Sequence, residues 1–151
     1  MSEIKYKTGF KYQLFEDYSV DVGVVPQEQI FCGRYLYLSE AGMLTMRNGY
    51  CWDGPSGPAI DSDTTIKPSL VHDALYQIIR RGFLPEDPYR EMADKVFREL
   101  MLSIVPEKES ESFSYWMNRK AHEVRCWYFY RAVRAFGSCA VQNPKELMVA
   151  P

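Results

Sequence analysis

Residues 69–79 read Ser69-Leu70-Val71-His72-Asp73-Ala74-Leu75-Tyr76-Gln77-Ile78-Ile79. The apolar side chains of this segment recur at intervals of three and four residues, which is the period of one helix face: Val71, Leu75, Ile78 and Ile79. Pro68 or Ser69 suits the first turn of such a helix, and Gly82 suits its end. We therefore expect a helix from about residue 68 to residue 82, with His72 and Tyr76 one turn apart on it.

A second helix is predicted after Asp87-Pro88, because Asp is a good N-cap and Pro suits the first helical position. Its buried face would consist of the following apolar residues: Ala93, Val96, Phe97, Leu100, Met101 and Ile104. Asp94 falls on the edge of this face, and an unpaired carboxylate in an apolar setting is costly. We therefore expect Asp94 to have a partner.

A third helix is predicted from about Ser112 to Phe136, with Gly137 as the residue that ends it. The aromatic run Trp127-Tyr128-Phe129-Tyr130 covers every face of this helix, which indicates burial or an interface. Residues 1–140 are expected to form a single globular domain, and residues 141–151 are expected to form a loose tail.

The first third of the chain has the alternating pattern of β-strands. Val20, Val22 and Val24 alternate with other residues, and residues 34–38 and 43–47 flank a predicted hairpin turn. Residues 10–15 suggest a further strand. The predicted fold class is therefore α+β, with a small N-terminal antiparallel β-sheet followed by three helices, the first two antiparallel.

The composition argues against a nucleic-acid-binding protein and against a membrane-spanning protein. The chain has 151 residues and a formal net charge of −2, with acidic and basic residues interleaved, so we expect no nucleic-acid partner. No segment approaches the roughly eighteen apolar residues that a membrane span needs, and the N-terminus lacks a secretory signal. We expect the chain to remain in the cytoplasm when made.

The cysteines are scattered along the chain and include no Cys-x-x-Cys pair. They are Cys32, Cys51, Cys126 and Cys139. Structural zinc sites usually contain close ligand pairs, so we expect reduced, mostly structural thiols instead.

His72 and its acidic neighbours form a candidate hydrolytic site. A neutral imidazole takes a proton from water when a carboxylate orients it, and Asp94 is the candidate for that role. Asp73 points about 100° away from His72 on a helix, so it is available to bind a cation together with Asp53 and carbonyls of the glycine-rich loop around Gly54. Calcium fits this set because all ligands apart from the histidine are hard oxygens.

The same residues are also compatible with a purely structural role. His72 would then be a core histidine that hydrogen-bonds Asp94, while Asp73 pins the long loop and Asp53 forms a turn. The residues themselves leave both interpretations open.

His72-Asp73-x-x-Tyr76 resembles the His-Asp-x-x-Tyr helix of the phospholipase A2 family, although Val71 and Leu75 stand where that family has cysteines. The resemblance covers roughly residues 50–100, including a glycine-rich loop before the helix and an aspartate on the next helix. It implies that His72 activates water, Asp94 orients it and Tyr76 buttresses the pair. It also implies calcium held by Asp73, Asp53 and the Gly54 region, and a lipid or small ester as substrate.

Over residues 50–137 the chain resembles an uncharacterised family of small proteins of tailed phages and prophages. The shared motifs are Trp52-Asp53-Gly54-x-Ser56, His72-Asp73-Ala74-Leu75-Tyr76, Ala93-Asp94-x-x-Phe97 and the segment 130–137. This resemblance implies a phage origin, synthesis in the host cytoplasm and a compact α+β domain.

Three classes of function remain open for this sequence. The first is a calcium-assisted ester hydrolase. The second is a non-catalytic component of the virion tail or baseplate, or of its assembly, with phage structural proteins as partners and the virion as its location. The third is a binder of a host protein or small molecule that blunts host defence.

Overall fold

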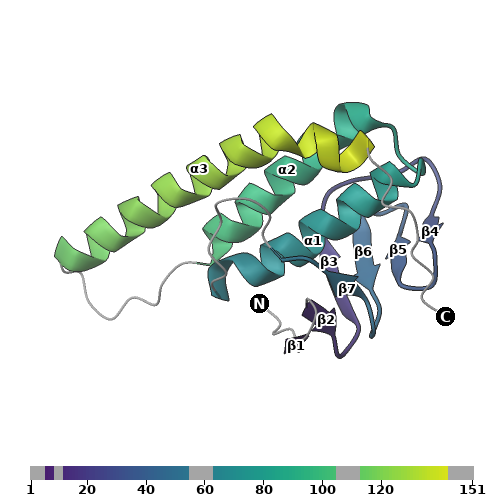
Figure 1. Cartoon of the computed structure of the whole chain (residues 1–151), viewed down its shortest axis with the longest axis horizontal. Helices are drawn as coiled ribbons and strands as arrows, with labels where there is room; N and C mark the ends of the chain where they lie inside the picture. Colours follow the sequence, from purple (N-terminus) through teal and green to yellow (C-terminus); the bar gives the residue numbers. More distant parts are fainter. Residues whose placement is uncertain (1–5, 9–11, 55–62, 105–112, 143–151) are drawn as a thin grey trace.

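The structure is a computed structural model that describes residues 6–8, 12–54, 63–104 and 113–142. Within these ranges it contains seven short strands followed by three helices, which confirms the predicted α+β class. Figure 1 shows the helices lying side by side, with the strands gathered beside the first helix.

The strands are antiparallel and are divided between two sheets, a division that the sequence pattern did not predict. Their bounds are β1 Tyr6–Thr8, β2 Tyr12–Leu14, β3 Tyr18–Asp21, β4 Ile30–Cys32, β5 Leu36–Leu38, β6 Met43–Met46 and β7 Cys51–Trp52. One sheet has the order β1-β2-β7 and the other the order β3-β6-β5-β4. The predicted hairpin is β5-β6, and its turn contains Gly42 at a φ of 84°, a conformation that favours glycine.

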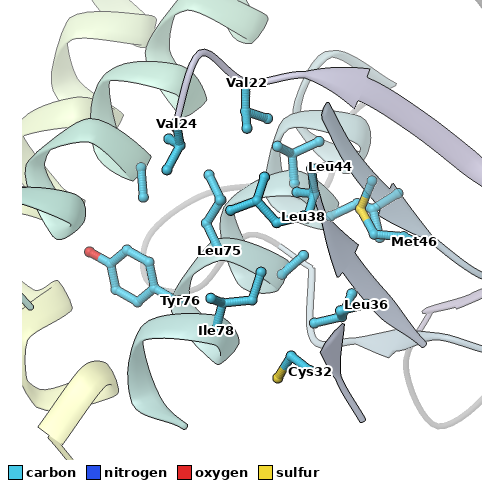
Figure 2. Close-up of a cluster of buried hydrophobic side chains, with 14 of the residues drawn as sticks. Val22, Val24, Cys32, Leu36, Leu38, Leu44, Met46, Leu75, Tyr76 and Ile78 are labelled. Atoms are coloured by element: carbon cyan, nitrogen blue, oxygen red, sulfur yellow. The ribbon is translucent and has the colours of Figure 1, made fainter. Parts of the chain in front are cut away.

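The larger sheet buries one face against the first helix, α1, which spans Asp63–Arg80. Alternate residues of β5 and β6 are at most 2% exposed: Leu36, Leu38, Leu44 and Met46. Figure 2 shows these side chains in one cluster with Leu75 and Ile78 of α1. Burying an aliphatic side chain of this size contributes about 1.5–3 kcal/mol, so this cluster anchors α1 on the sheet.

Helix α1 starts before the predicted position at residue 68, and Pro68 therefore lies inside it. Proline cannot donate the backbone hydrogen bond of a helix interior, which is why local preference favoured a later start. The earlier turn is helical because Thr65 and Ile66 are buried, and tertiary burial outweighs local propensity. The predicted end is close to the observed one, since α1 ends at Arg80 and Gly82, two residues later, has a φ of 78°.

Helix α2 spans Glu86–Ser103, with a non-helical residue near its start. Asp87 has a φ of −103° and a ψ of 128°, so the regular helix follows it, as the Asp87-Pro88 pair predicted. Ala93, Val96 and Phe97 are buried as expected, and Asp94 is buried with them.

Helix α3 spans Phe113–Gln142, and the prediction that Gly137 ends it is wrong. The helix continues past Gly137 to the buried Val141, and a residue without a Cβ atom is needed at position 137 because the backbone passes close to Tyr76 there. A Cβ atom at position 137 would collide with the Tyr76 hydroxyl. The predicted start of the tail at residue 141 is also wrong, since Val141 is buried in the helix; residues 143–151 lie outside the described residues.

Contacts between the helices define their directions. Arg125 donates to Thr64 at 3.4 Å and Arg80 donates to the Ala140 carbonyl at 3.2 Å, so α1 and α3 run in the same direction. His122 lies 2.9 Å from the Met101 carbonyl, whereas Arg90 bonds to the Arg134 carbonyl at 3.3 Å. Helix α2 therefore runs opposite to both, and the predicted antiparallel pairing of α1 and α2 is confirmed.

Within the described ranges, no helix combines the length and the apolar character needed to cross a membrane.

Candidate functional site

Asp94 lies at the centre of a buried cluster contributed by all three helices. Its carboxylate is fully buried, and its Oδ1 atom accepts hydrogen bonds from His72 Nε2 at 2.9 Å and from the Tyr76 hydroxyl at 2.7 Å. Its Oδ2 atom accepts a hydrogen bond from Arg134 Nη1 at 3.0 Å. Both carboxylate oxygens are therefore paired, as the expectation of a partner for Asp94 required.

Helix periodicity explains how these side chains converge. His72 and Tyr76 are one turn apart on α1, so both can face α2, where Asp94 follows the buried Ala93. The His72 ring is packed between two aromatic rings, with centroid distances of 4.1 Å to Tyr76 and 5.0 Å to Phe97. The imidazole is thereby held by packing as well as by the carboxylate.

The sequence did not single out Arg134 as the ligand of Asp94. Arg134 comes from α3, forty residues away along the chain, and its carbonyl accepts a hydrogen bond from Arg90. The available signal was indirect: a carboxylate predicted on a buried face needs a cation or donors, and α3 carries several arginines. Only the packing of α3 identifies which arginine fills this role.

Interactions with neighbouring groups outweigh burial in setting the pKa values of His72 and Asp94. Burial alone would lower the pKa of His72, but the carboxylates of Asp73 and Asp94 raise it above its ordinary value. Burial alone would raise the pKa of Asp94, but the bonds from His72, Tyr76 and Arg134 hold it below its ordinary value. Burial, followed by the Asp94 charge, raises the pKa of Tyr76 well above its ordinary range. Asp94 is thus an anion and Tyr76 a neutral donor at neutral pH.

Asp73 lies on the other side of the imidazole. Its Oδ1 atom is 3.9 Å from His72 Nδ1, and its side chain is 28% exposed, compared with 10% for the His72 side chain. Its Oδ2 atom accepts a hydrogen bond from the backbone N–H of Asp53 at 3.3 Å. The structure therefore brings Asp73 and Asp53 together, as predicted.

The start of the glycine-rich loop is held against α1. The indole of Trp52 donates to Ser69 Oγ at 3.1 Å, and that hydroxyl donates to the Ile66 carbonyl at 2.7 Å. Gly54 is buried at a φ of 75°. Residues 55–62 of this loop lie outside the described residues. Among the described residues, no three His, Cys, Asp or Glu side chains are grouped as metal ligands.

The second histidine belongs to a separate structural contact. His122 is buried, with Nε2 2.9 Å from the Met101 carbonyl at the end of α2, and its Nδ1 accepts a hydrogen bond from Arg125 at 3.1 Å. Nearby Cys126 is buried, and burial raises the pKa of its thiol. Cys32, Cys51 and Cys126 are all free thiols. His122 therefore lies where α3 packs against the end of α2, away from the Asp94 cluster.

The chain matches no protein-family model, no curated protein and no solved structure. The phage-family and phospholipase A2 resemblances therefore remain predictions from the sequence.

Proposed function

We propose that the protein hydrolyses ester bonds, with His72 as the general base and Asp94 as the residue that positions it. The observation that carries this proposal is the hydrogen bond between His72 Nε2 and Asp94. A carboxylate at Nε2 favours the tautomer with the proton on that nitrogen, which leaves the lone pair of Nδ1 available to water.

The surroundings of Nδ1 support the proposal. This nitrogen faces the partly exposed Asp73 side chain rather than the apolar core, so the Asp73 side is the natural direction of approach for water and substrate. Asp94 would stabilise the imidazolium that forms when His72 takes the proton. Tyr76 and Arg134 hold the Asp94 carboxylate in place through the remaining lone pairs.

We also propose that Asp73 holds a calcium ion, together with the Asp53 and Gly54 region. Carboxylate and backbone carbonyl oxygens are ordinary ligands of calcium. The hydrogen bond from the Asp53 backbone N–H to the Asp73 carboxylate keeps these two residues close to each other. A calcium ion at this position would polarise the carbonyl group of a lipid or small ester.

The hydrolysis proposal is tested with p-nitrophenyl butyrate and with phosphatidylglycerol vesicles, both in calcium-containing buffer. We expect His72→Gln to lower kcat/KM at least about 100-fold, because general-base catalysis contributes that much or more. His122→Gln is the matched control and should keep the wild-type rate. Identical rates for wild type and His72→Gln on both substrates would refute the proposal.

The calcium proposal is tested separately by titration calorimetry of the purified protein. Asp73→Asn should abolish the binding heat, whereas the exposed Asp87→Asn should leave it unchanged. If wild type gives no heat and no thermal stabilisation with calcium, the metal is not part of the site.

A second candidate function is a non-catalytic component of the phage particle or of its assembly. It is supported by several large apolar side chains that α3 exposes, including Trp127 at 55% and Val124 at 65%. In such a protein the Asp94 cluster would only join the three helices. Phage particles carrying His72→Gln would then be fully infectious, whereas loss of infectivity with retained folding favours catalysis. The third class, binding of a host protein or small molecule, remains a prediction.

A further inference from the structure

Helix α3 has a buried face and an opposite apolar face that is exposed. His122, Cys126 and Phe129 recur at intervals of three and four residues and pack inward. The outward side chains, which we call the α3 outer face, are Trp116, Met117, Val124, Trp127 and Tyr128. Each of them is between 48% and 65% exposed. Helix geometry places these five within roughly one third of the helix circumference, so they form a continuous stripe.

The first turns of α3 are exposed over more of their circumference than the rest of the helix. Residues 116–121 are all exposed, and Figure 1 shows this end of α3 extending beyond α1 and α2. An isolated helical segment is only marginally stable in water, and most helical stability in proteins comes from packing an apolar face. A partner along the α3 outer face would supply that packing.

The size of the stripe fits a second copy of the chain. A half-exposed side chain of this size offers about 100 Å², so the stripe offers on the order of 500 Å² of apolar area. Two copies would bury about 1,000 Å² of apolar surface, and the polar residues at its margins bring the total into the range of about 1,200–2,000 Å² that stable dimers use.

The charges on the stripe permit self-association. Lys120 is paired with Glu123 at 2.8 Å, and the Arg131 guanidinium lies 5.8 Å from the centre of the Trp127 ring. The Lys120 charge is therefore offset by an acid of the same chain, and the Arg131 cation is held over the Trp127 ring at one end of the stripe. Exposed Ala121 and Ala135 leave room beside the large side chains for interdigitation.

We propose that the α3 outer face is a homodimer interface in which two α3 helices pack antiparallel across a two-fold axis near Val124. The antiparallel arrangement places the projecting Met117 end of each helix along the outer face of the other. It also aligns the two helix dipoles favourably. Two-fold dimers are the commonest closed assemblies of identical chains.

The oligomeric state tests the proposal by sedimentation equilibrium of the full chain. We expect wild type to be a dimer and Val124→Glu to be a monomer with an unchanged circular dichroism spectrum, because Val124 is 65% exposed. Val25→Glu is the matched control, since Val25 is 57% exposed and belongs to the segment between β3 and β4, and it should remain a dimer. A wild-type chain that stays monomeric up to sub-millimolar concentration overturns the proposal, as does a Val124→Glu dimer as tight as wild type.

Disulfide trapping tests the arrangement. In a background with the exposed Cys51 changed to serine, Val124→Cys should form a covalent dimer under mild oxidation, because it faces its own counterpart across the axis. Met117→Cys, about two turns away, should not. Equal trapping of both variants indicates parallel helices, and trapping of neither in a confirmed dimer places the interface elsewhere; either result overturns this arrangement.

Discussion

Because Gly137 packs against Tyr76, the substitution Gly137→Ala should change the stability of the protein through two opposing effects. Alanine at position 137 should stabilise the isolated helix by about 1 kcal/mol, because glycine is a poor helix former. In the folded chain, however, the new Cβ would collide with the Tyr76 hydroxyl and lie 3.1 Å and 3.2 Å from two carbons of its ring.

The expected net effect of Gly137→Ala follows from these contacts. Forcing an extra methyl into a packed site costs about 1–3 kcal/mol. Displacing the Tyr76 hydroxyl also removes its 2.7 Å bond to Asp94, and a bond to a charged group contributes about 1.5–3 kcal/mol. After the gain in helix propensity is subtracted, Gly137→Ala should destabilise the protein by about 1.5–5 kcal/mol.

A double-mutant cycle with Tyr76→Phe isolates the collision. The phenylalanine variant already lacks the hydroxyl, so adding Gly137→Ala to it should cost no more than about 1 kcal/mol. The assay is urea unfolding of all four proteins, followed by circular dichroism. The coupling energy, which is the difference between these two costs, should be at least about 0.5 kcal/mol.

The control is Ala135→Gly, an exposed position on the same helix, combined with Tyr76→Phe. It reports helix propensity alone and should be additive with the tyrosine change. The reasoning fails if Gly137→Ala stabilises the protein, or if its effect is the same with tyrosine and with phenylalanine at position 76.

Three further predictions concern the Asp94 cluster and the loop anchor. Asp94→Asn keeps the side-chain shape but leaves Arg134, which is 30% exposed, facing an uncharged amide. Urea unfolding should show a loss of about 1.5–3 kcal/mol, because hydrogen bonds to a charged carboxylate are lost. The lowered pKa of Asp94 contributes stability that is present above about pH 4 and lost as pH falls through its folded pKa. The raised pKa of His72 contributes stability that is present below about pH 6.5 and lost as pH rises through its folded pKa. Urea midpoints measured against pH should therefore decline below about pH 4 and above about pH 6.5. His72→Gln should reduce the decline on the alkaline side. An unchanged alkaline decline in this variant would contradict the assignment of that decline to His72. Trp52→Phe removes the bond to Ser69 and should cost about 1–3 kcal/mol of thermal or urea stability, whereas Phe31→Leu at an exposed position should cost little.

Local sequence patterns were sufficient to predict much of the secondary structure of this protein. The three-and-four spacing of Val71, Leu75 and Ile78 predicted α1, and the alternation around residues 34–47 predicted the β5-β6 hairpin, because helix and strand periods are properties of the backbone alone. The need of a buried carboxylate for partners likewise predicted that Asp94 would be paired. His72 and Asp94 could therefore be joined before the fold was known.

Long-range packing decided the features that local patterns missed. Burial of Ile66 extended α1 to the N-terminal side of Pro68, and burial of Val141 extended α3 past Gly137. The position of α3 selected Arg134 as the cation for Asp94. Each of these depends on contacts between residues distant in the chain, and the free energy of such contacts exceeds the local preferences of about 1–3 kcal/mol for glycine and proline. Sequence alone thus determined the helices, the hairpin and the His72–Asp94 pair, whereas tertiary packing determined where the helices end and which third side chain completes the site.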